Sequence, residues 1–417
     1  MLSCYRVLDL SDDKGFLCGK ALGDLGAEVI KIEKPGGDPA RKVGPFYHDI
    51  PDPEKSLYWF AFNANKKSIT LDLETADGRE LFKRLVKTAD VVVESFAPGH
   101  MDELGLGYSV LSEINPEIIM TSITGFGQEG PYRNYNDRDI AVWALSGYMY
   151  ITGEPDRPPL APSYRHGHLL GAINGAVGTM IALYHRGITG RGQQVDAATH
   201  QALVFAISVE TKTPWAVEKV IVDRQGRSRA LVTAKDGELR FPFLWECKDG
   251  SVVVTLWFGS GPGFDKANNA LVEWIRSDGI DPGVLGRIDW RTESWSDYTI
   301  ADVKEIIETM SRFFKQHTKM ELHDGALGRR IQLTPLLTPK DQLEFPQLVA
   351  RDFWRAIIHP ELETTITYPG GFVKLSGADC GIRRQAPLIG EHNDQVYKGL
   401  LGMSAADMLT LMQARVI

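Results

Sequence analysis

The first third of the chain alternates short, mainly apolar runs with segments whose apolar residues recur every three or four positions. Runs without regular polar alternation are typical of strands that are buried on both faces of a parallel sheet. They occupy residues 7–10, 29–32, 69–73, 91–93 and 118–120. The intervening segments, for example 17–25, have helical spacing. This order predicts a doubly wound α/β domain.

The pattern changes twice after that domain. Residues 137–211 are mainly helical. Small residues that allow close helix packing recur along them: Gly171, Ala172, Gly175, Ala176, Gly178 and Ala182. Strand-like runs return at 239–245 and 252–257 and are followed by helical segments. We therefore expect a second, smaller α+β domain at residues 228–312, which the chain reaches through a linker at 213–227.

Composition excludes several classes of protein. The 417 residues are 43% hydrophobic and 24% charged, which provides enough apolar material for a large core. The formal net charge is −8, without long charge blocks, and this argues against a nucleic-acid partner. The chain contains no run of about 18 apolar residues, so the sequence predicts no membrane span. The N-terminal residues resemble a strand rather than a signal peptide. We therefore expect a cytoplasmic protein.

Two ligand classes lack their usual motifs. The turn after the first predicted strand, residues 11–19, has no G-x-G-x-x-G, so dinucleotide binding is not supported. The four cysteines lie far apart without metal-ligand spacing; they are Cys4, Cys18, Cys247 and Cys380. We expect buried, inert thiols, no metal site and no permanently bound cofactor.

A series of longer motifs runs along the chain. The series comprises LGAEVIKIEKP at 25–35, NANKKSITLD at 63–72, TSITGFGQEGPY at 121–132, TGEPDRPP at 152–159, TGRGQQVD at 189–196 and PLIGEH at 387–392. It resembles the class III CoA-transferases, the formyl-CoA and carnitine CoA-transferase family, to which the α-methylacyl-CoA racemases are related. Because many motifs occur in one order, the resemblance covers nearly the whole chain.

The resemblance implies an architecture that the spacing of apolar residues does not. The Rossmann-like large domain is built from both chain ends, residues 1–212 and 335–417. The smaller domain at 228–312 then lies between two linkers, 213–227 and 313–334. In this family two subunits thread through one another, so an interlocked dimer is also expected.

The resemblance places CoA against the N-terminal domain, where basic groups attract its phosphates. Three residues match CoA contacts of the family, the cation Lys34 and the apolar Leu71 and Phe96. Two basic residues of the family are replaced by Glu103 and Asn136. Since each charge-assisted contact contributes ~1–3 kcal/mol, we expect a degraded CoA site.

Residues near this site would either weaken CoA binding further or compensate for the missing basic residues. The loop after the first predicted strand carries two carboxylates, Asp12 and Asp13, and Ser95 replaces an asparagine of the family. The alternative is that other lysines, such as Lys66 and Lys67, supply the phosphate contacts.

His168 stands where the resemblance places the nucleophilic aspartate, counted back from Arg186 through ungapped helical sequence. A carboxylate can attack a thioester and carry CoA as an aspartyl thioester, whereas an imidazole cannot take that role. The related racemases use a histidine and an aspartate where this chain has Arg138 and His168. We therefore expect no catalytic nucleophile here, and we expect His168 to be a hydrogen-bonded helix residue.

Further candidates have a structural and a functional interpretation. Asp139 is expected to cap or pair at the start of its own helix, and Asp196 to begin another helix. The glycine-rich segment 258–264 resembles the mobile loop that shields acyl-CoA intermediates, although ordinary turns have the same composition. A small basic cluster contains Arg224, Arg227 and Arg229. It is expected on a solvated linker, the alternative being a contact to a partner subunit or a dicarboxylate substrate.

A chain that has the motifs of the family but lacks its nucleophile is predicted to work as part of a heteromer. We expect this chain to be the subunit lacking the nucleophilic aspartate, inactive alone, with a paralogous subunit supplying that residue. The resemblance implies transfer of CoA from succinyl-CoA to a carboxylic acid such as (R)-benzylsuccinate, as in anaerobic toluene degradation. One alternative is a stand-alone, racemase-like acid–base enzyme that uses His168 as base. The other is a non-enzymatic protein that binds acyl-CoA or serves as a structural partner.

Overall fold

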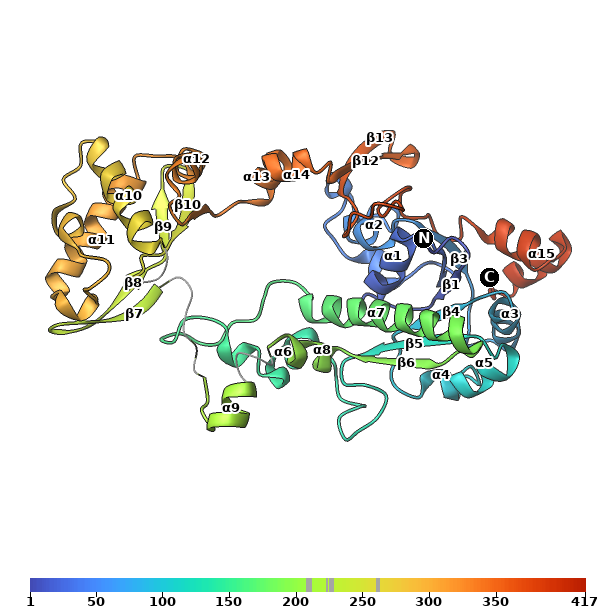
Figure 1. Cartoon of the computed structure of the whole chain (residues 1–417). Helices are drawn as coiled ribbons and strands as arrows, with labels where there is room; N and C mark the ends of the chain where they lie inside the picture. The colour runs from blue at the N-terminus through green and yellow to red at the C-terminus, as the bar shows by residue number, and fades with distance from the viewer. Residues whose placement is uncertain (208–211, 223, 225–228, 260–262) are drawn as a thin grey trace. The chain divides into compact units, whose positions relative to one another are not determined.

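The computed structural model describes residues 1–207, 212–222, 224, 229–259 and 263–417. The chain divides into two compact units (Figure 1). Unit 1 comprises Met1–Met149, Ala161–Val222 and Pro346–Ile417, and unit 2 comprises Tyr150–Leu160 and Asp223–Phe345. Both chain ends therefore belong to unit 1.

Unit 1 is built on a six-stranded parallel sheet. Its strands are β1 (Arg6–Asp9), β2 (Glu28–Glu33), β3 (Lys66–Thr70), β4 (Val91–Glu94), β5 (Ile119–Thr124) and β6 (Gln194–Ala198). Their order is β3-β2-β1-β4-β5-β6, so the winding reverses between β1 and β4. Leu8 of β1 is in register with Ile30 of β2 and Val92 of β4. The doubly wound α/β class that the sequence predicted is confirmed.

Helices cover both faces of this sheet (Figure 1). On one face, α1 (Phe16–Asp24) and α7 (His166–Thr189) pack on strand residues such as Val93 and Ile123. On the other face, α3 (Ala76–Val86), α5 (Tyr108–Ile114) and the C-terminal α15 (Ala405–Gln413) pack on Val92 and Met120. The centres of β1, β2 and β4 are mainly apolar because both faces of the sheet are buried, whereas β3 carries Lys66, Lys67 and Ser68.

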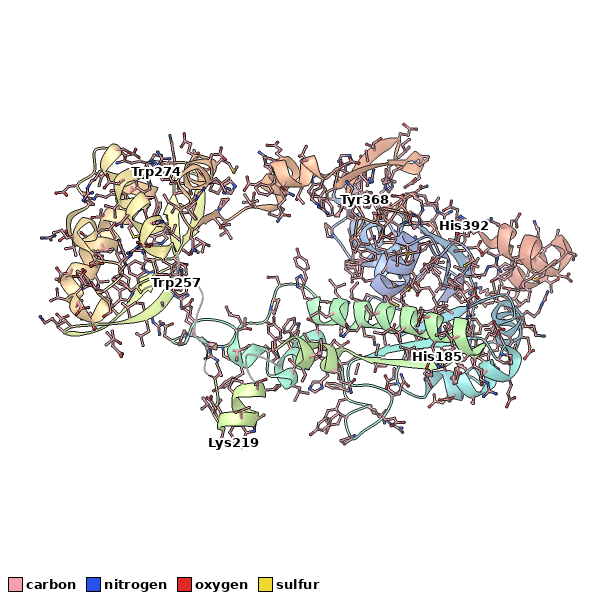
Figure 2. All side chains as sticks on the ribbon, in the orientation of Figure 1. His185, Lys219, Trp257, Trp274, Tyr368 and His392 are labelled. Atoms are coloured by element: carbon pink, nitrogen blue, oxygen red, sulfur yellow. The ribbon has the colours of Figure 1, made fainter. Side chains whose placement is uncertain are left out.

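Shorter elements complete unit 1. They are α2 (Leu57–Asn63), α4 (His100–Glu103), α6 (Asp139–Ser146), α8 (Thr199–Ala206), α9 (Thr213–Glu218), α14 (Pro346–Ala350), β12 (Trp354–His359) and β13 (Thr364–Pro369). The C-terminal segment is fixed to the sheet near β3, where the backbone N–H of His392 (labelled in Figure 2) donates to Ser68 O at 2.9 Å. The N–H of Asp72 likewise donates to Val416 O at 2.8 Å.

Unit 2 has its own apolar core and antiparallel strands. Its elements are β7 (Arg229–Ala234), β8 (Gly237–Pro242), β9 (Leu244–Cys247), β10 (Gly250–Val254), α10 (Phe264–Ser277), α11 (Ile300–Phe314), α12 (Lys319–Arg329), β11 (Leu333–Pro335) and α13 (Pro339–Glu344). Trp290, Ile306 and Phe313 are almost completely buried in the core. Strands and helices in one small core agree with the expected α+β domain.

The structure differs from the expected linker at 313–334. That segment contains α12, whose Leu322 and Ala326 are fully buried in the core of unit 2. A capping box between Thr318 and Glu321 begins the helix, because each side chain accepts the backbone N–H of the other residue. Unit 2 therefore continues to Phe345.

Helix α7 is long and apolar enough, by length and composition alone, to cross a membrane. Half of its most apolar 18-residue window is nevertheless buried inside the protein. Small residues make this packing possible, since a Cβ at Gly175 would lie 2.9 Å from Ile123 and one at Gly178 2.6 Å from Val195. The helix is therefore a core element of unit 1.

Candidate functional site

The carboxyl ends of the central strands enclose a cavity of about 380 Å³. Lys34 follows β2, Leu71 follows β3 and Phe96 follows β4, and all three line this cavity. They meet because parallel strands bring their carboxyl ends to one edge, next to the reversal of winding between β1 and β4. The structure thus brings together the three residues that the sequence assigned to CoA.

The cations around this cavity are already paired with carboxylates. Lys34 Nζ lies 3.6 Å from Glu74 Oε1. Lys14 Nζ lies 3.5 Å from Asp12 Oδ2 and 3.3 Å from Asp137 Oδ2. Although burial lowers the pKa of Lys14, the Asp12 and Asp137 carboxylates outweigh it and raise the pKa, so the ammonium charge is retained. Free positive potential for a phosphate is therefore low.

The carboxylates of the loop after β1 are also paired or hydrogen-bonded. Arg165 forms an ion pair with Asp13. Ser95 Oγ donates to Asp12 Oδ1 at 2.6 Å and accepts the Asp12 N–H at 2.8 Å, which fixes the loop to β4. Burial raises the pKa of Asp38, a further carboxyl on the cavity wall. This rim is more acidic than basic.

Lys66 and Lys67 do not replace the missing cations. Lys66 is fully buried, and its Nζ donates to Asp9 Oδ2 at 2.8 Å and to the Phe16 carbonyl at 2.9 Å. Lys67 Nζ donates to Glu28 Oε1 at 2.5 Å. Neither residue lines the cavity.

His168 is the third residue of α7, and it is only 5% exposed. Its Nε2 lies 2.8 Å from the carbonyl oxygen of Asp137. Because a carbonyl only accepts, Nε2 carries a proton and donates it to this oxygen. Nδ1 is buried without a hydrogen-bond partner among the described residues, 3.9 Å from Asp139 Oδ1. Nε2 is thus occupied by a hydrogen bond inside the protein, and Nδ1 is buried.

Asp139 caps α7 rather than its own helix, which corrects one sequence expectation. It lies in the first turn of α6, and its Oδ1 accepts the His168 backbone N–H at 2.9 Å. Gly167 leaves room for this contact, since a Cβ there would lie 2.8 Å from Asp139 Oδ1 and 3.0 Å from Trp143 Nε1. Sequence reasoning missed the Asp139–His168 contact because 29 residues separate the two positions and no motif links them.

Other sequence candidates have structural roles or are not described. Asp196 lies within β6 and not at a helix start, and its Oδ2 accepts the Gln128 N–H at 2.9 Å. Arg224 donates to the carbonyls of Tyr150 and Arg157 at 3.1 and 3.2 Å, and so supports the 150–160 segment of unit 2. Three positions of the glycine-rich segment, 260–262, lie outside the described residues, as do residue 227 and the side chain at 229.

The outer face of α7 is a continuous apolar surface. Val177, Ile181 and Tyr184 are 52%, 62% and 76% exposed. They line a cavity of about 390 Å³ together with α1 residues and Phe372. Exposed apolar patches of this kind mark interaction sites. Within the described ranges, no three His, Cys, Asp or Glu side chains gather as a metal site.

Comparison with known proteins places these features in context. The sequence model of CoA-transferase family III matches residues 2–393. The succinyl-CoA:(R)-benzylsuccinate CoA-transferase subunit BbsE of Thauera aromatica is 33% identical over 94% of this chain and 93% of its own length. The beta subunit of succinyl-CoA–L-malate CoA-transferase from Chloroflexus aurantiacus is 30% identical over 96% of this chain and 94% of its own.

The fold has solved counterparts. A CAIB/BAIF family protein from Brucella suis superposes with a TM-score of 0.80 at 27% identity. The superposition covers 96% of this chain and 99% of that protein.

Proposed function

The chain belongs to CoA-transferase family III, and from that premise we propose that it is the subunit without a nucleophile in a heteromeric CoA-transferase. The observation that carries the proposal is His168, where the sequence resemblance places the nucleophilic aspartate. The imidazole donates through Nε2 to the Asp137 carbonyl and buries Nδ1, so it can neither form an acyl anhydride nor act as base.

The partner's aspartate then performs the covalent steps. Its carboxylate attacks the succinyl thioester and forms an anhydride while CoA leaves as the thiolate. The thiolate attacks the aspartyl carbonyl and releases succinate, which leaves CoA bound as an aspartyl thioester. The acceptor carboxylate then attacks the aspartyl thioester, which gives a second anhydride and releases the CoA thiolate. The thiolate attacks the acceptor's acyl carbonyl in this anhydride, and this step releases the new thioester and the aspartate.

A second line of support is the charge of the cleft. Lys34 and Lys14 are each opposed by carboxylates, and Glu103 stands where the family has a basic residue. CoA bound here would have to displace these pairs while approaching an acidic rim. We infer that the partner's cleft holds CoA and that this subunit contributes the scaffold and part of the acceptor pocket.

The partner itself is supported by two features. The exposed apolar residues of α7 lie together on its outer face and are not scattered singly over the surface. A second chain would cover this face. Relatives of this chain carry names that describe subunits, BbsE in one case and malate transferase alpha and beta subunits in others. We propose an interlocked heteromer that uses succinyl-CoA as donor and (R)-benzylsuccinate as acceptor.

Co-expression tests this function. The chain is produced alone and together with a paralogous subunit that has aspartate where this chain has His168. CoA transfer from succinyl-CoA to (R)-benzylsuccinate is followed by chromatography, and intact-mass measurement after acid quenching locates the covalent CoA. We expect transfer only from the pair, with the adduct on the partner.

Two variants separate the roles of the chains. Changing the partner's aspartate to alanine abolishes transfer, whereas His168→Ala in this chain leaves most of it. Full transfer by this chain alone, or a CoA adduct on it, contradicts the proposal. Exchange of an acyl-CoA α-proton in deuterated buffer by the chain alone instead supports the racemase-like alternative.

The charge argument gives a separate prediction for CoA affinity. Glu74→Gln frees Lys34 for a phosphate, and we expect CoA to bind the isolated chain roughly tenfold more tightly, which is about 1.4 kcal/mol. Titration calorimetry measures the change. The matched control is Glu80→Gln, which breaks the exposed pair with Lys83 on α3, outside the cavity, and leaves the affinity unchanged. Equal effects of both variants would show that only net charge matters.

A further inference from the structure

A second cavity, of about 440 Å³, lies on the face of the sheet that carries Val92 and Glu94. Strands β4 and β5 form its floor, and α4 and α5 form its walls. Glu94 and Ser122 are in register on adjacent strands, so a carboxyl and a hydroxyl stand side by side on the floor. The amino-terminal half of this face is covered by apolar side chains, whereas this half is polar and open.

Glu94 differs from the other buried carboxylates of the described residues. Asp9 is paired with Lys66 at 2.8 Å, Asp24 with Lys20 at 2.5 Å, and Glu33 with Arg41 at 2.7 Å. Glu94 is as deeply buried, at 3% exposure, but no described cation forms an ion pair with it. Buried charges are normally paired, so the fourth carboxyl lacks a counter-charge that the other three have.

The hydrogen bonds of Glu94 leave it directed at the cavity. Its Oε2 accepts the backbone N–H of Phe96 at 2.8 Å, and Ser122 is its in-register neighbour on β5. Burial is the main reason that its pKa is raised to about 7. An adjacent cation would offset that cost by stabilising the carboxylate.

The cavity lining selects against an anionic ligand. Among the described residues that line it there is no lysine, arginine or histidine, and Asp102 adds a second carboxylate at α4. The remaining polar groups are hydroxyls and amides, among them Tyr108, Ser109 and Gln194. The terminal amide of Gln128 also lines the cavity, and its Nε2 is buried without a hydrogen-bond partner in the described structure. The carboxylates, hydroxyls and amide oxygens of this lining supply acceptors for an N–H donor, whereas the Gln128 Nε2 group is itself a donor.

We propose that this cavity binds a small organic ammonium ion, a primary amine of a few carbon atoms, with Glu94 as its counter-charge. The ammonium donates to the Glu94 carboxylate and to the Ser122 hydroxyl, and the alkyl chain lies along Met101 and Met120. The site is separate from the Lys34 cleft, and its occupancy does not require a transferase partner.

Titration calorimetry on the purified full-length chain tests this site, with n-butylammonium as the probe and n-butanol as its uncharged counterpart. We expect n-butylammonium to bind and n-butanol not to bind. Glu94→Gln keeps an acceptor for the Phe96 N–H but removes the charge, and it should weaken n-butylammonium binding at least tenfold. The control Glu80→Gln makes the same substitution at an exposed position of α3 and should bind as the parent does.

A second variant guards against a general effect of Glu94→Gln on folding. Ala97 is exposed and lines the cavity, so Ala97→Phe fills the space without altering the carboxyl. It should also abolish binding, and thermal unfolding verifies that each variant is folded. Absence of binding by the parent chain, equal binding by Glu94→Gln, or equal binding of n-butanol would overturn the proposal. Transfer activity is not measured, so its presence or absence leaves these outcomes unchanged.

Discussion

Single residues in unit 1 show how burial and pairing together set the behaviour of a charge. Asp9 is completely buried, and burial by itself raises its pKa, yet Lys66 and Lys31 outweigh this and lower the pKa. Glu94 is buried to a similar degree without a paired lysine, and its pKa rises to about 7. Lys14 and Asp12 exert only weaker, opposing influences on it from the β1 loop. A buried carboxylate thus stabilises or destabilises the fold according to its neighbour.

Glu94 gives a pH-dependent stability with a defined sign. Its pKa is higher in the folded state than the ordinary glutamate value of 4.5, so the folded state binds the proton more tightly. The stability it contributes is present at low pH and is lost as the pH rises through about 7. We expect Glu94→Gln to gain about 3 kcal/mol over the parent between pH 5 and pH 8. Urea unfolding at both pH values measures this, and a difference that is independent of pH would contradict it.

At the scale of elements, buried strands were easier to predict than the contacts between distant segments. Strands β1, β2, β4 and β5 were predicted from apolar runs such as residues 91–93, which double burial favours. Strand β3 begins at Lys66, before the expected 69–73, because its first three residues are polar. Strand β6 was missed because it lies at the sheet edge, where Val195 is flanked by the exposed Gln194 and Asp196. An edge strand needs only partial burial, so its apolar pattern is weak.

In the candidate site, too, the positions of strand ends were easier to predict than contacts made by loops. Lys34, Leu71 and Phe96, which the resemblance assigned to CoA, line one cavity because residues that follow parallel strands converge at one edge of the sheet. The Lys34–Glu74 and Lys14–Asp137 pairs depend on loop conformation, which has no periodic signal in the sequence. Helix α12 was missed as well, since its apolar face is narrow and polar residues surround it.

The exposed apolar face of helix α7 is predicted to be the contact surface for a partner subunit. Ile181→Lys places a cation in the middle of the exposed apolar face, where it would lose solvation on association with a partner. We expect the variant to fold normally and to lose heteromer formation at least tenfold in light scattering coupled to size exclusion. Leu409→Lys on α15, where the leucine is 57% exposed, is the matched control and should assemble normally. Assembly by both variants would place the interface elsewhere.

At the scale of the whole molecule, two separate apolar cores are built into one chain. The core of unit 2 consists entirely of residues between Val232 and Leu333, and the sheet clusters of unit 1 contain none of them. Local stability can differ between two such cores because each opens with its own free energy.

Cavity-creating substitutions test this independence. Ile306 and Leu85 are each fully buried, the first in unit 2 and the second in unit 1. Replacement by alanine should cost about 2–5 kcal/mol in each case. Hydrogen exchange followed by mass spectrometry should show faster exchange only in the unit that carries the substitution. Uniform acceleration throughout both units would indicate a single cooperative core.

The apolar stripe on α7 has a consequence for the life of the polypeptide in the cell. A newly made copy without its companion displays Val177, Ile181 and Tyr184 to water, and chaperones and proteases act on surfaces of this kind. Unpaired copies would be retained or degraded, whereas paired copies would persist. The amount of this polypeptide should therefore track the synthesis of its companion more closely than that of its own messenger RNA.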